Sequence, residues 1–114
     1  MSIHSIENLF YFEKDKFLRY THCNEGMAEV LGLDSPSQVI GKSDFDLIWK
    51  EHADLYRGRD SVIIRKKVHK NGIIEPQRQQ TGNHSIAITK APVLGKNSEA
   101  VGITGFFTNI EAQP

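Results

Sequence analysis

The sequence has almost no cysteine and no long apolar run. Its 114 residues include one cysteine, Cys23, so no internal disulfide can form and the chain suits a reducing compartment. No stretch approaches the ~20 apolar residues that a membrane-spanning helix needs. The first residues contain neither the basic segment nor the apolar segment of a signal peptide. We therefore expect a cytoplasmic protein.

The sequence also lacks an excess of charge of either sign. Lysine plus arginine and aspartate plus glutamate both number 14, so the formal net charge is zero. Because phosphate backbones attract proteins with a basic surplus, we expect no direct nucleic-acid partner. The basic run at 65–67 is interpreted as the end of a helix, where cations complement the helix dipole.

Motifs for catalysis and for metal binding are missing as well. The chain has no nucleophile elbow, no glycine-rich phosphate loop and no HExxH motif, so we do not expect an enzyme. Its histidines show no spacing suited to zinc and are expected at the surface. They are His4, His22, His52, His69 and His84.

What the sequence does contain is a regular succession of short elements. Residue types and turn signals predict strands at 9–13, 17–23, 74–81, 84–94 and 100–110, and helical segments at 25–31, 34–40, 43–49 and 50–67. Because successive strands joined by short turns form hairpins, the sheet should be antiparallel, with three short helices and one long helix over one face. We expect an α+β domain over 9–110, an N-terminal flank at 1–8 and a tail or linker start at 111–114.

The stretch from Gly41 to Trp49 has its own helix-start signal. Ser43 and Asp46 stand three residues apart, as in a capping box, and Asp44 and Asp46 are expected to complement the helix dipole. Phe45, Ile48 and Trp49 follow at helical spacing. The sequence thus predicts an aromatic-rich helical turn in the middle of the domain.

The long helix carries an acidic residue in an unusual place. Asp60 lies four residues after Tyr56 and three before Ile63, within the apolar stripe rather than opposite it. We expect a buried carboxylate that is satisfied by backbone N–H groups near Ser43 and Asp44, or by an arginine.

Several segments, taken together, resemble the PAS sensor domain family of bacterial signal transduction. They are Tyr11–Asp15, Cys23-Asn24, Gly41–Asp46, Asp60, Lys90-Ala91-Pro92 and Val101-Gly102-Ile103. The resemblance implies a five-stranded antiparallel sheet of order 2-1-5-4-3. It also implies a signalling module that passes its state to an output domain, such as a histidine kinase, a cyclic-di-nucleotide enzyme or a transcriptional regulator. No complete output domain fits in this chain beside the sensor, so we expect either a fragment whose output domain lies outside this chain or a stand-alone module.

The resemblance also allows two cofactors to be weighed. Light-sensing relatives use a cysteine at the end of the segment matching Gly41–Asp44, where this chain has Asp44, which cannot replace a soft nucleophile. Heme-bearing relatives place a histidine in the region matching 55–60, which has none here. We expect neither covalent flavin chemistry nor heme and leave the cofactor unknown. Cys23 is interpreted as a small buried apolar residue.

The function predicted from these observations is a non-catalytic input module that senses a small ligand between helices and sheet. The candidate lining residues are Thr21, Met27, Ile40, Phe45, Ile48, Trp49, Tyr56, Asp60, Ile63, Ile86, Ile88, Ile103 and Phe107. The alternative is that the same residues fill the core and that the chain is a ligand-free homodimerisation or protein-interaction module of a kinase or regulator. Its partner surface would then be the outer sheet face, expected to carry Phe10, Phe12, Leu18, Tyr20 and Phe106.

Overall fold

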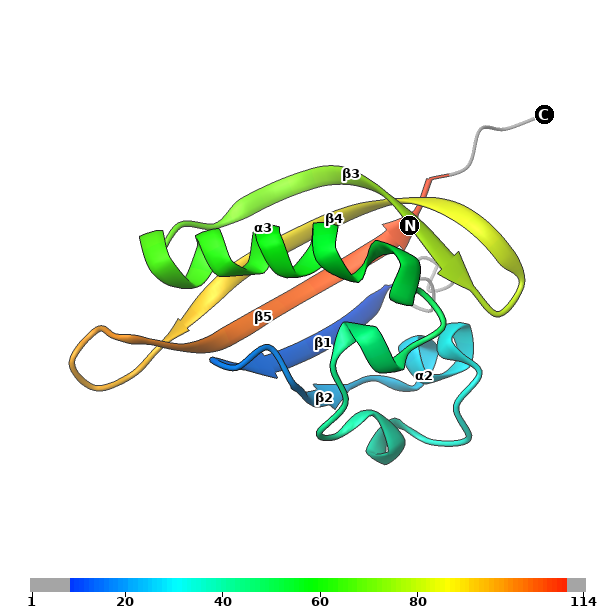
Figure 1. Ribbon diagram of the computed structural model, residues 1–114, viewed down its shortest axis with the longest axis horizontal. Coiled ribbons are helices and arrows are strands. Elements are labelled where there is room, and N and C mark those ends of the chain that lie inside the picture. The colour runs from blue at the N-terminus through cyan, green and yellow to red at the C-terminus, as the bar shows by residue number, and fades with distance from the viewer. Residues whose placement is uncertain (1–8, 111–114) are drawn as a thin grey trace, which may run out of the picture.

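The computed structural model describes residues 9–110, and the flank and tail expected at 1–8 and 111–114 lie outside this range. One antiparallel sheet is covered on one face by helices (Figure 1). Its strands are β1 (Phe10–Asp15), β2 (Tyr20–Cys23), β3 (Lys70–Gln79), β4 (Gly82–Leu94) and β5 (Ala100–Asn109). The helical segments are α2 (Glu25–Leu31), η1 (Pro36–Val39), η2 (Asp44–Asp46), η3 (Lys50–His52) and α3 (Ala53–Lys66). The strand order β2-β1-β5-β4-β3 and the α+β class confirm the predicted fold.

The first strand is longer than the sequence predicted. β1 continues to Asp15, so Lys14, which was expected in a turn, is part of the strand. Alternate residues of β1 face the helices, and Phe10, Phe12 and Lys14 are all buried. Lys14 was left out of the predicted strand because it is polar. In the structure it continues the inward-facing row of Phe10 and Phe12.

The central helical turn is shorter than expected. Ser43 Oγ accepts the N–H of Phe45, and Asp46 Oδ2 accepts the N–H of Ser43 at 2.9 Å, which confirms the capping box. The helix nevertheless ends after one 3₁₀ turn, with Leu47 already extended, so the helical spacing does not continue. The predicted apolar face is consequently wrong, since Phe45 and Ile48 are exposed and only Trp49 is buried.

The long helix α3 packs its buried stripe against the sheet. Tyr56, Asp60 and Ile63 are all buried, which confirms that Asp60 lies within the apolar face. The helix ends with Arg65 and Lys66, followed by Lys67 in a left-handed conformation, as the basic run predicted. Among the described residues, no helix has both the length and the apolar character that a membrane crossing requires.

The core lies between the helices and the inner sheet face. Phe12 packs across β5 at Gly105, where an added Cβ would come within 2.6 Å of the phenyl ring. Phe10 and Phe12 also contact Phe107, with ring centroids 5.1 and 6.4 Å apart. Replacing Gly105 by any larger residue would therefore displace the aromatic side chains of this core.

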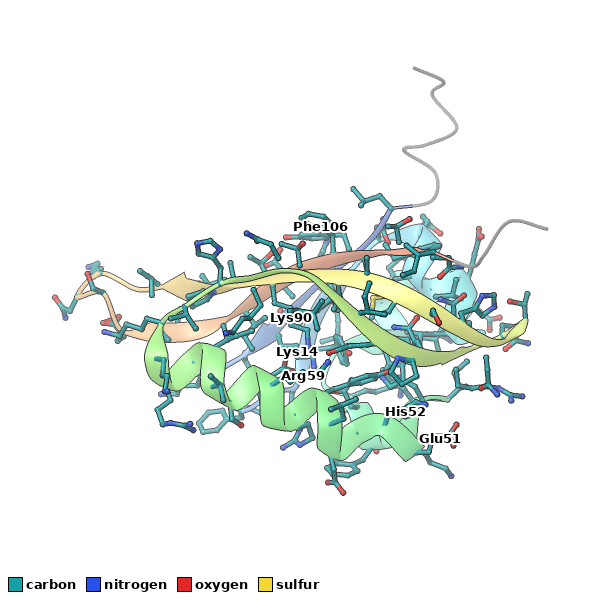
Figure 2. All side chains as sticks on the ribbon, turned by 90° about the horizontal axis from the view of Figure 1, so that it is seen from above. Lys14, Glu51, His52, Arg59, Lys90 and Phe106 are labelled. Carbon is teal, nitrogen blue, oxygen red and sulfur yellow. The ribbon has the colours of Figure 1, made fainter. Side chains whose placement is uncertain are left out.

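The expected composition of the outer sheet face is largely wrong. Phe10, Phe12, Leu18 and Tyr20 all lie in the core, whereas Phe106 is 44 % exposed. Figure 2 shows Phe106 on the side of the sheet opposite α3. Because neighbouring residues in a strand point to opposite faces, an assignment shifted by one residue moves a whole row from one face to the other.

Candidate functional site

Two strands place a lysine on the inner sheet face directly after two apolar residues. On β1 the inward row is Phe10, Phe12, Lys14, and on β4 it is Ile86, Ile88, Lys90. Both lysines are nearly inaccessible, at 3 % and 4 % exposure, and lie between the sheet and α3 (Figure 2). A buried ammonium group is stable only when it is paired, so the helices must supply anions opposite both lysines.

Two aspartates from the helical layer supply those anions. Lys14 Nζ lies 2.7 Å from Asp44 Oδ2 and 2.6 Å from Asp60 Oδ2, and Lys90 Nζ lies 2.7 Å from Asp60 Oδ1. These ion pairs connect the four side chains in the order Lys90–Asp60–Lys14–Asp44, and their two positive charges equal their two negative charges. We refer to these four residues as the charge network.

Two neutral side chains complete the charge network at Asp44. Tyr20 donates its hydroxyl to Asp44 Oδ1 at 2.6 Å, and Trp49 donates its indole N–H to the same oxygen at 2.9 Å. Among the described residues, no buried polar side-chain atom lacks a hydrogen-bond partner. The network therefore ties β1, β2, η2, α3 and β4 together within the core.

Burial and pairing act in opposite directions on the ionisation of this network. Burial alone would raise the pKa of Asp60, but Lys14 and Lys90 outweigh it and hold that pKa below its usual value. Burial alone would lower the pKa of Lys14, but Asp60 and Asp44 hold it above its usual value. Burial, followed by the charge of Asp44, raises the pKa of Tyr20 well above its usual value. Asp60 and Lys14 are thus both charged at neutral pH.

The network corrects two expectations about the aspartates. Asp60 pairs with two lysines, not with backbone N–H groups or an arginine. Asp44 is fully buried and accepts three side-chain donors, so it has no exposed role in complementing a helix dipole. The sequence did contain one signal for this pairing. Lys14 and Lys90 each follow an inward-facing apolar residue by two positions, which places both lysines on the inner face of the sheet.

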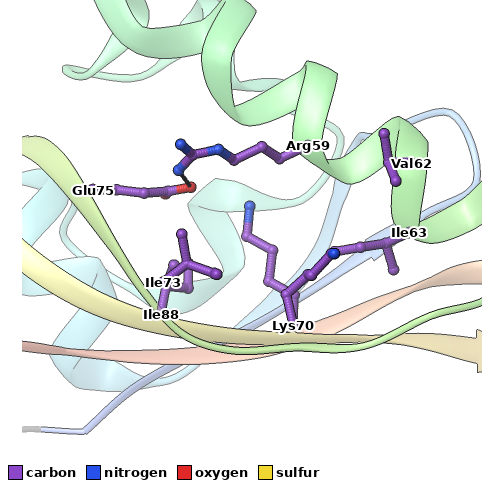
Figure 3. Close-up of a pocket in the computed structure, with 8 residues that line it drawn as sticks. Arg59, Val62, Ile63, Lys70, Ile73, Glu75 and Ile88 are labelled. Carbon is purple, nitrogen blue, oxygen red and sulfur yellow. Dashed lines mark hydrogen bonds and ion pairs between the residues drawn. The ribbon is translucent and has the colours of Figure 1, made fainter.

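A cavity of about 340 Å³ opens beside the network, between α3 and the sheet (Figure 3). It is lined by Arg59, Val62, Ile63, Lys70, Ile73, Glu75, Ile88 and Lys90. Arg59 Nη1 pairs with Glu75 Oε2 at 2.7 Å across it, and Glu75 is only 2 % exposed. This volume lies at the lower end of the range for small-molecule sites, and the mixture of apolar walls with a few charged groups is typical of them.

The structure brings only part of the predicted lining to this cavity. Among the thirteen candidates, only Ile63 and Ile88 line it. Met27, Trp49, Tyr56, Asp60, Ile86, Ile103 and Phe107 are buried in the core. Thr21, Ile40, Phe45 and Ile48 are exposed and do not line it.

Several of the other predicted lining residues meet at the centre of the fold. Where Trp49, Tyr56 and Phe107 meet Ile88 and the lysines, a void of only about 10 Å³ remains. Side chains fill this centre, and the open space lies toward β3 instead. Sequence reasoning missed Arg59, Val62, Lys70, Ile73, Glu75 and Lys90 as lining residues. β3 is polar in composition and lies at the edge of the sheet, yet its inward side chains Glu75, Gln77 and Gln79 are buried.

Flavin and heme do not fit the centre of this fold. A void of about 10 Å³ is at most enough for one water molecule and far too small for either group. Asp44, which stands where light-sensing relatives have the reactive cysteine, accepts hydrogen bonds from Lys14, Tyr20 and Trp49. Cys23 is 2 % exposed, as predicted, and burial raises the pKa of its thiol to about 11. Within residues 9–110, no group of three or more histidine, cysteine or acidic side chains is arranged to hold a metal ion.

Solved structures with the same fold include receptors and their PAS domains. VqmA bound to DPO superposes with a TM-score of 0.80 at 20 % identity, over 90 % of this chain and 51 % of that one. The Vibrio cholerae VqmA dimer gives 0.82 at 18 % identity, over 97 % and 52 %. The chain thus spans about half the length of VqmA.

A third similar structure is a PAS domain solved by itself with a ligand. The PAS domain of the Cronobacter turicensis quorum-sensing receptor RpfR, in complex with BDSF, gives a TM-score of 0.70 at 15 % identity, over 91 % of this chain and 95 % of that one. No curated protein matches the sequence. The model that describes the PAS fold matches residues 4–113, nearly the whole sequence. The chain therefore belongs to the PAS fold family.

Proposed function

We propose that this domain is a non-catalytic sensory input module that binds a small molecule in the cavity between α3, β3 and β4. The observation that carries the proposal is the cavity of about 340 Å³, with four apolar and four charged lining residues. A change there would be passed to an output domain of a kinase or a transcriptional regulator. VqmA and RpfR, which share the fold, have been solved with DPO and BDSF bound, and this supports the assignment.

The charge network offers a physical route from the cavity to the rest of the domain. Lys90 lines the cavity and also pairs with Asp60, which pairs in turn with Lys14 on β1. A ligand that draws Lys90 toward itself weakens its bond to Asp60, because the ammonium hydrogens are shared between both acceptors. The strength of pairing at β1 would then depend on whether the cavity is occupied.

Filling the cavity tests the proposal. Val62 lines the cavity and is half-buried, so Val62→Phe should occupy much of the space that a ligand needs. The matched control is Ser61→Phe, which adds a phenyl ring at an exposed neighbouring position of the same helix. The measurement is the thermal midpoint of each protein with fractions of a metabolite extract, together with mass spectrometry of molecules released on denaturation.

A ligand at one hundred times its Kd should stabilise the native domain by about 2.7 kcal/mol. We expect this gain for the original protein and for Ser61→Phe, and its loss for Val62→Phe. If no fraction stabilises the original protein and no molecule is released, or if Val62→Phe responds as the original does, the sensory proposal is wrong.

A second candidate function is homodimerisation through the outer sheet face. In the described residues no helix covers this face (Figure 1), and it carries Ile74 at 59 %, Phe106 at 44 % and Val93 at 37 % exposure. Apolar side chains gathered on an uncovered sheet face are typical of partner surfaces. The V. cholerae VqmA structure is of a dimer, so a second copy of this chain is the occupant that we propose.

The dimer proposal is tested by placing a charge on that face. Phe106→Glu should convert a dimer to a monomer in light scattering at high protein concentration, because a carboxylate would be buried without a partner. Phe17→Glu is the control, since Phe17 is 62 % exposed but lies in the β1–β2 turn. A monomeric original protein, or a dimer unaffected by Phe106→Glu, would contradict the proposal. Loss of dimerisation without loss of ligand binding would separate the two functions.

A further inference from the structure

We propose that the cavity selects a small apolar organic acid whose carboxylate is held by Lys70 and Lys90. This inference rests on the proposed function, because it names the chemical class of the ligand for the same cavity. Its basis is the charge of the lining residues, the register of β3 against β4 and one carboxylate oxygen without a partner.

The first observation is that Lys70 and Lys90 are direct cross-strand neighbours. They are paired in the β3–β4 register, and both line the cavity. Like charges directly opposite each other on adjacent strands repel. Lys90 is neutralised by Asp60, whereas within residues 9–110 no acidic side chain pairs with Lys70. An anion bound between the two ammonium groups would relieve this repulsion.

The backbone at this point is irregular and places Lys70, which is exposed, at the edge of the cavity. The β3–β4 register shifts between Lys70 and Ile73, and Gly72 adopts a left-handed conformation with φ 62°. The N–H of Gly72 is satisfied by Thr89 Oγ1 at 3.1 Å rather than by a ladder carbonyl. Figure 3 shows the Lys70 ammonium group pointing from the strand into the space below α3. Bulges of this kind redirect side chains and are frequent beside binding sites.

The charge count of the site favours an anion. Arg59, Lys70 and Lys90 are three cations, and their acidic partners Glu75 and Asp60 are two, which leaves one positive charge in excess. Lys90 has one acceptor among the described residues, Asp60 Oδ1, so its ammonium group can donate further hydrogen bonds. A monocarboxylate would balance the excess and accept from both lysines.

The remaining walls define the rest of the ligand. Val62, Ile63, Ile73 and Ile88 are apolar, and burying an aliphatic body against them is favourable. At about 30 Å³ for each water-sized group, a cavity of about 340 Å³ accommodates roughly ten non-hydrogen atoms. The expected ligand is therefore a short branched or cyclic acid, not a nucleotide or a long-chain lipid.

Glu75 adds a preference among such acids. Its Oε2 accepts from Arg59, and no described residue donates to its other oxygen at the cavity wall. A ligand with a hydroxyl or amino group can donate to that oxygen and so gains one charge-assisted hydrogen bond. Hydroxy acids and amino acids should therefore bind more tightly than the plain acid.

The test is calorimetric titration of the intact chain with four probes of one carbon skeleton. Isocaproate is the plain acid, α-hydroxyisocaproate and leucine add a hydroxyl or an amino group, and isocaproamide is the neutral counterpart. We expect the acids to bind at least ten-fold more tightly than the amide. We expect Lys70→Gln to weaken acid binding about ten-fold, because one charge-assisted contact is lost at a half-open site. The control Lys66→Gln removes one exposed positive charge at the end of α3, away from the cavity, and should leave affinity unchanged.

A second variant tests the role of Glu75. Glu75→Gln should reduce the advantage of the hydroxy or amino acid over isocaproate, and the difference between the two probes shows which donor is preferred. Equal binding of acid and amide, equal affinity of Lys70→Gln and the original protein, or no binding of any probe would overturn the proposal. Stabilisation by a metabolite without a carboxylate that Val62→Phe abolishes would refute the acid while supporting the sensory function, so the two failures are distinguishable.

Discussion

Replacing Asp60 with asparagine removes the negative charge that Lys14 and Lys90 share. The side chains of all three residues are at most 5 % exposed, so water cannot replace the lost partner. An asparagine of similar shape still offers one oxygen, but its NH₂ group would face the other ammonium group. Lys14 keeps Asp44, whereas Lys90 has no other acidic partner among the described residues.

The expected cost follows from this geometry. Removing one partner of a buried ion pair typically costs 3–5 kcal/mol, because the other charge stays buried without compensation. We take about 3 kcal/mol, since Lys90 also borders the cavity and can gain some hydration there. This is a large part of the 5–15 kcal/mol that stabilises a typical domain. For a domain of 114 residues it corresponds to a fall of roughly 12 °C in Tm.

The assay is urea denaturation followed by the fluorescence of Trp49. This is the only tryptophan of the chain, and its indole N–H reports on the network because it donates to Asp44. Asp54→Asn is the control, since Asp54 is an exposed acid in the first turn of the same helix and should cost less than about 1 kcal/mol. If Asp60→Asn unfolded at the same urea concentration as the original protein, the reasoning about the network would be wrong.

Three further predictions concern the network and the buried thiol. The free energy of unfolding should be nearly constant from about pH 5 to 9. Folding lowers the pKa of Asp60 from 3.8, so its contribution to stability is complete above pH 3.8 and is lost as the pH falls through the folded pKa. At the other end, the contribution of Lys14, whose pKa is raised from 10.5, is complete below that value and disappears as the pH rises through the folded pKa. Urea midpoints across the pH range check this, and a steep loss between about pH 6 and 8 would contradict it. Trp49→Phe should cost about 2 kcal/mol in thermal melts followed by circular dichroism, because Asp44 loses a donor, and an unchanged Tm would show that the bond is worth little. Cys23 should react with a disulfide reagent at pH 8 at least ~100-fold more slowly in the native state than in urea, because a thiol with a pKa of about 11 is almost fully protonated, and equal rates would argue against its burial.

Local residue patterns were enough to predict the order of the elements. The capping box of Ser43 and Asp46 and the basic residues at the end of α3 depend on neighbours within a few positions, and both are found in the structure. The place of Asp60 in an apolar stripe also follows from helical spacing alone. Strand order followed from the family resemblance, and the structure confirms it.

The site depended on contacts between segments that are far apart in the chain. Lys14, Asp44, Asp60 and Lys90 are separated by 16 to 76 positions in the sequence, and only Asp60 is unusual in its own surroundings. Whether a lysine near the end of a strand is a turn residue or a buried cation depends on the acid that α3 and η2 place opposite it. The position of the cavity likewise depends on how the helices meet the sheet, since Trp49 fills the centre and leaves space toward β3.

The sequence by itself therefore determined the fold class, because hydrophobic periodicity and turn residues act over short distances. It did not determine the site, because a buried charge and a cavity are defined by partners from other strands and helices. A one-residue shift in strand register would have moved Lys14 and Lys90 to the outer face, where they would be ordinary solvated lysines. Only the tertiary structure pairs them with Asp44 and Asp60 beneath α3 and makes Lys90 part of the wall of a candidate ligand site.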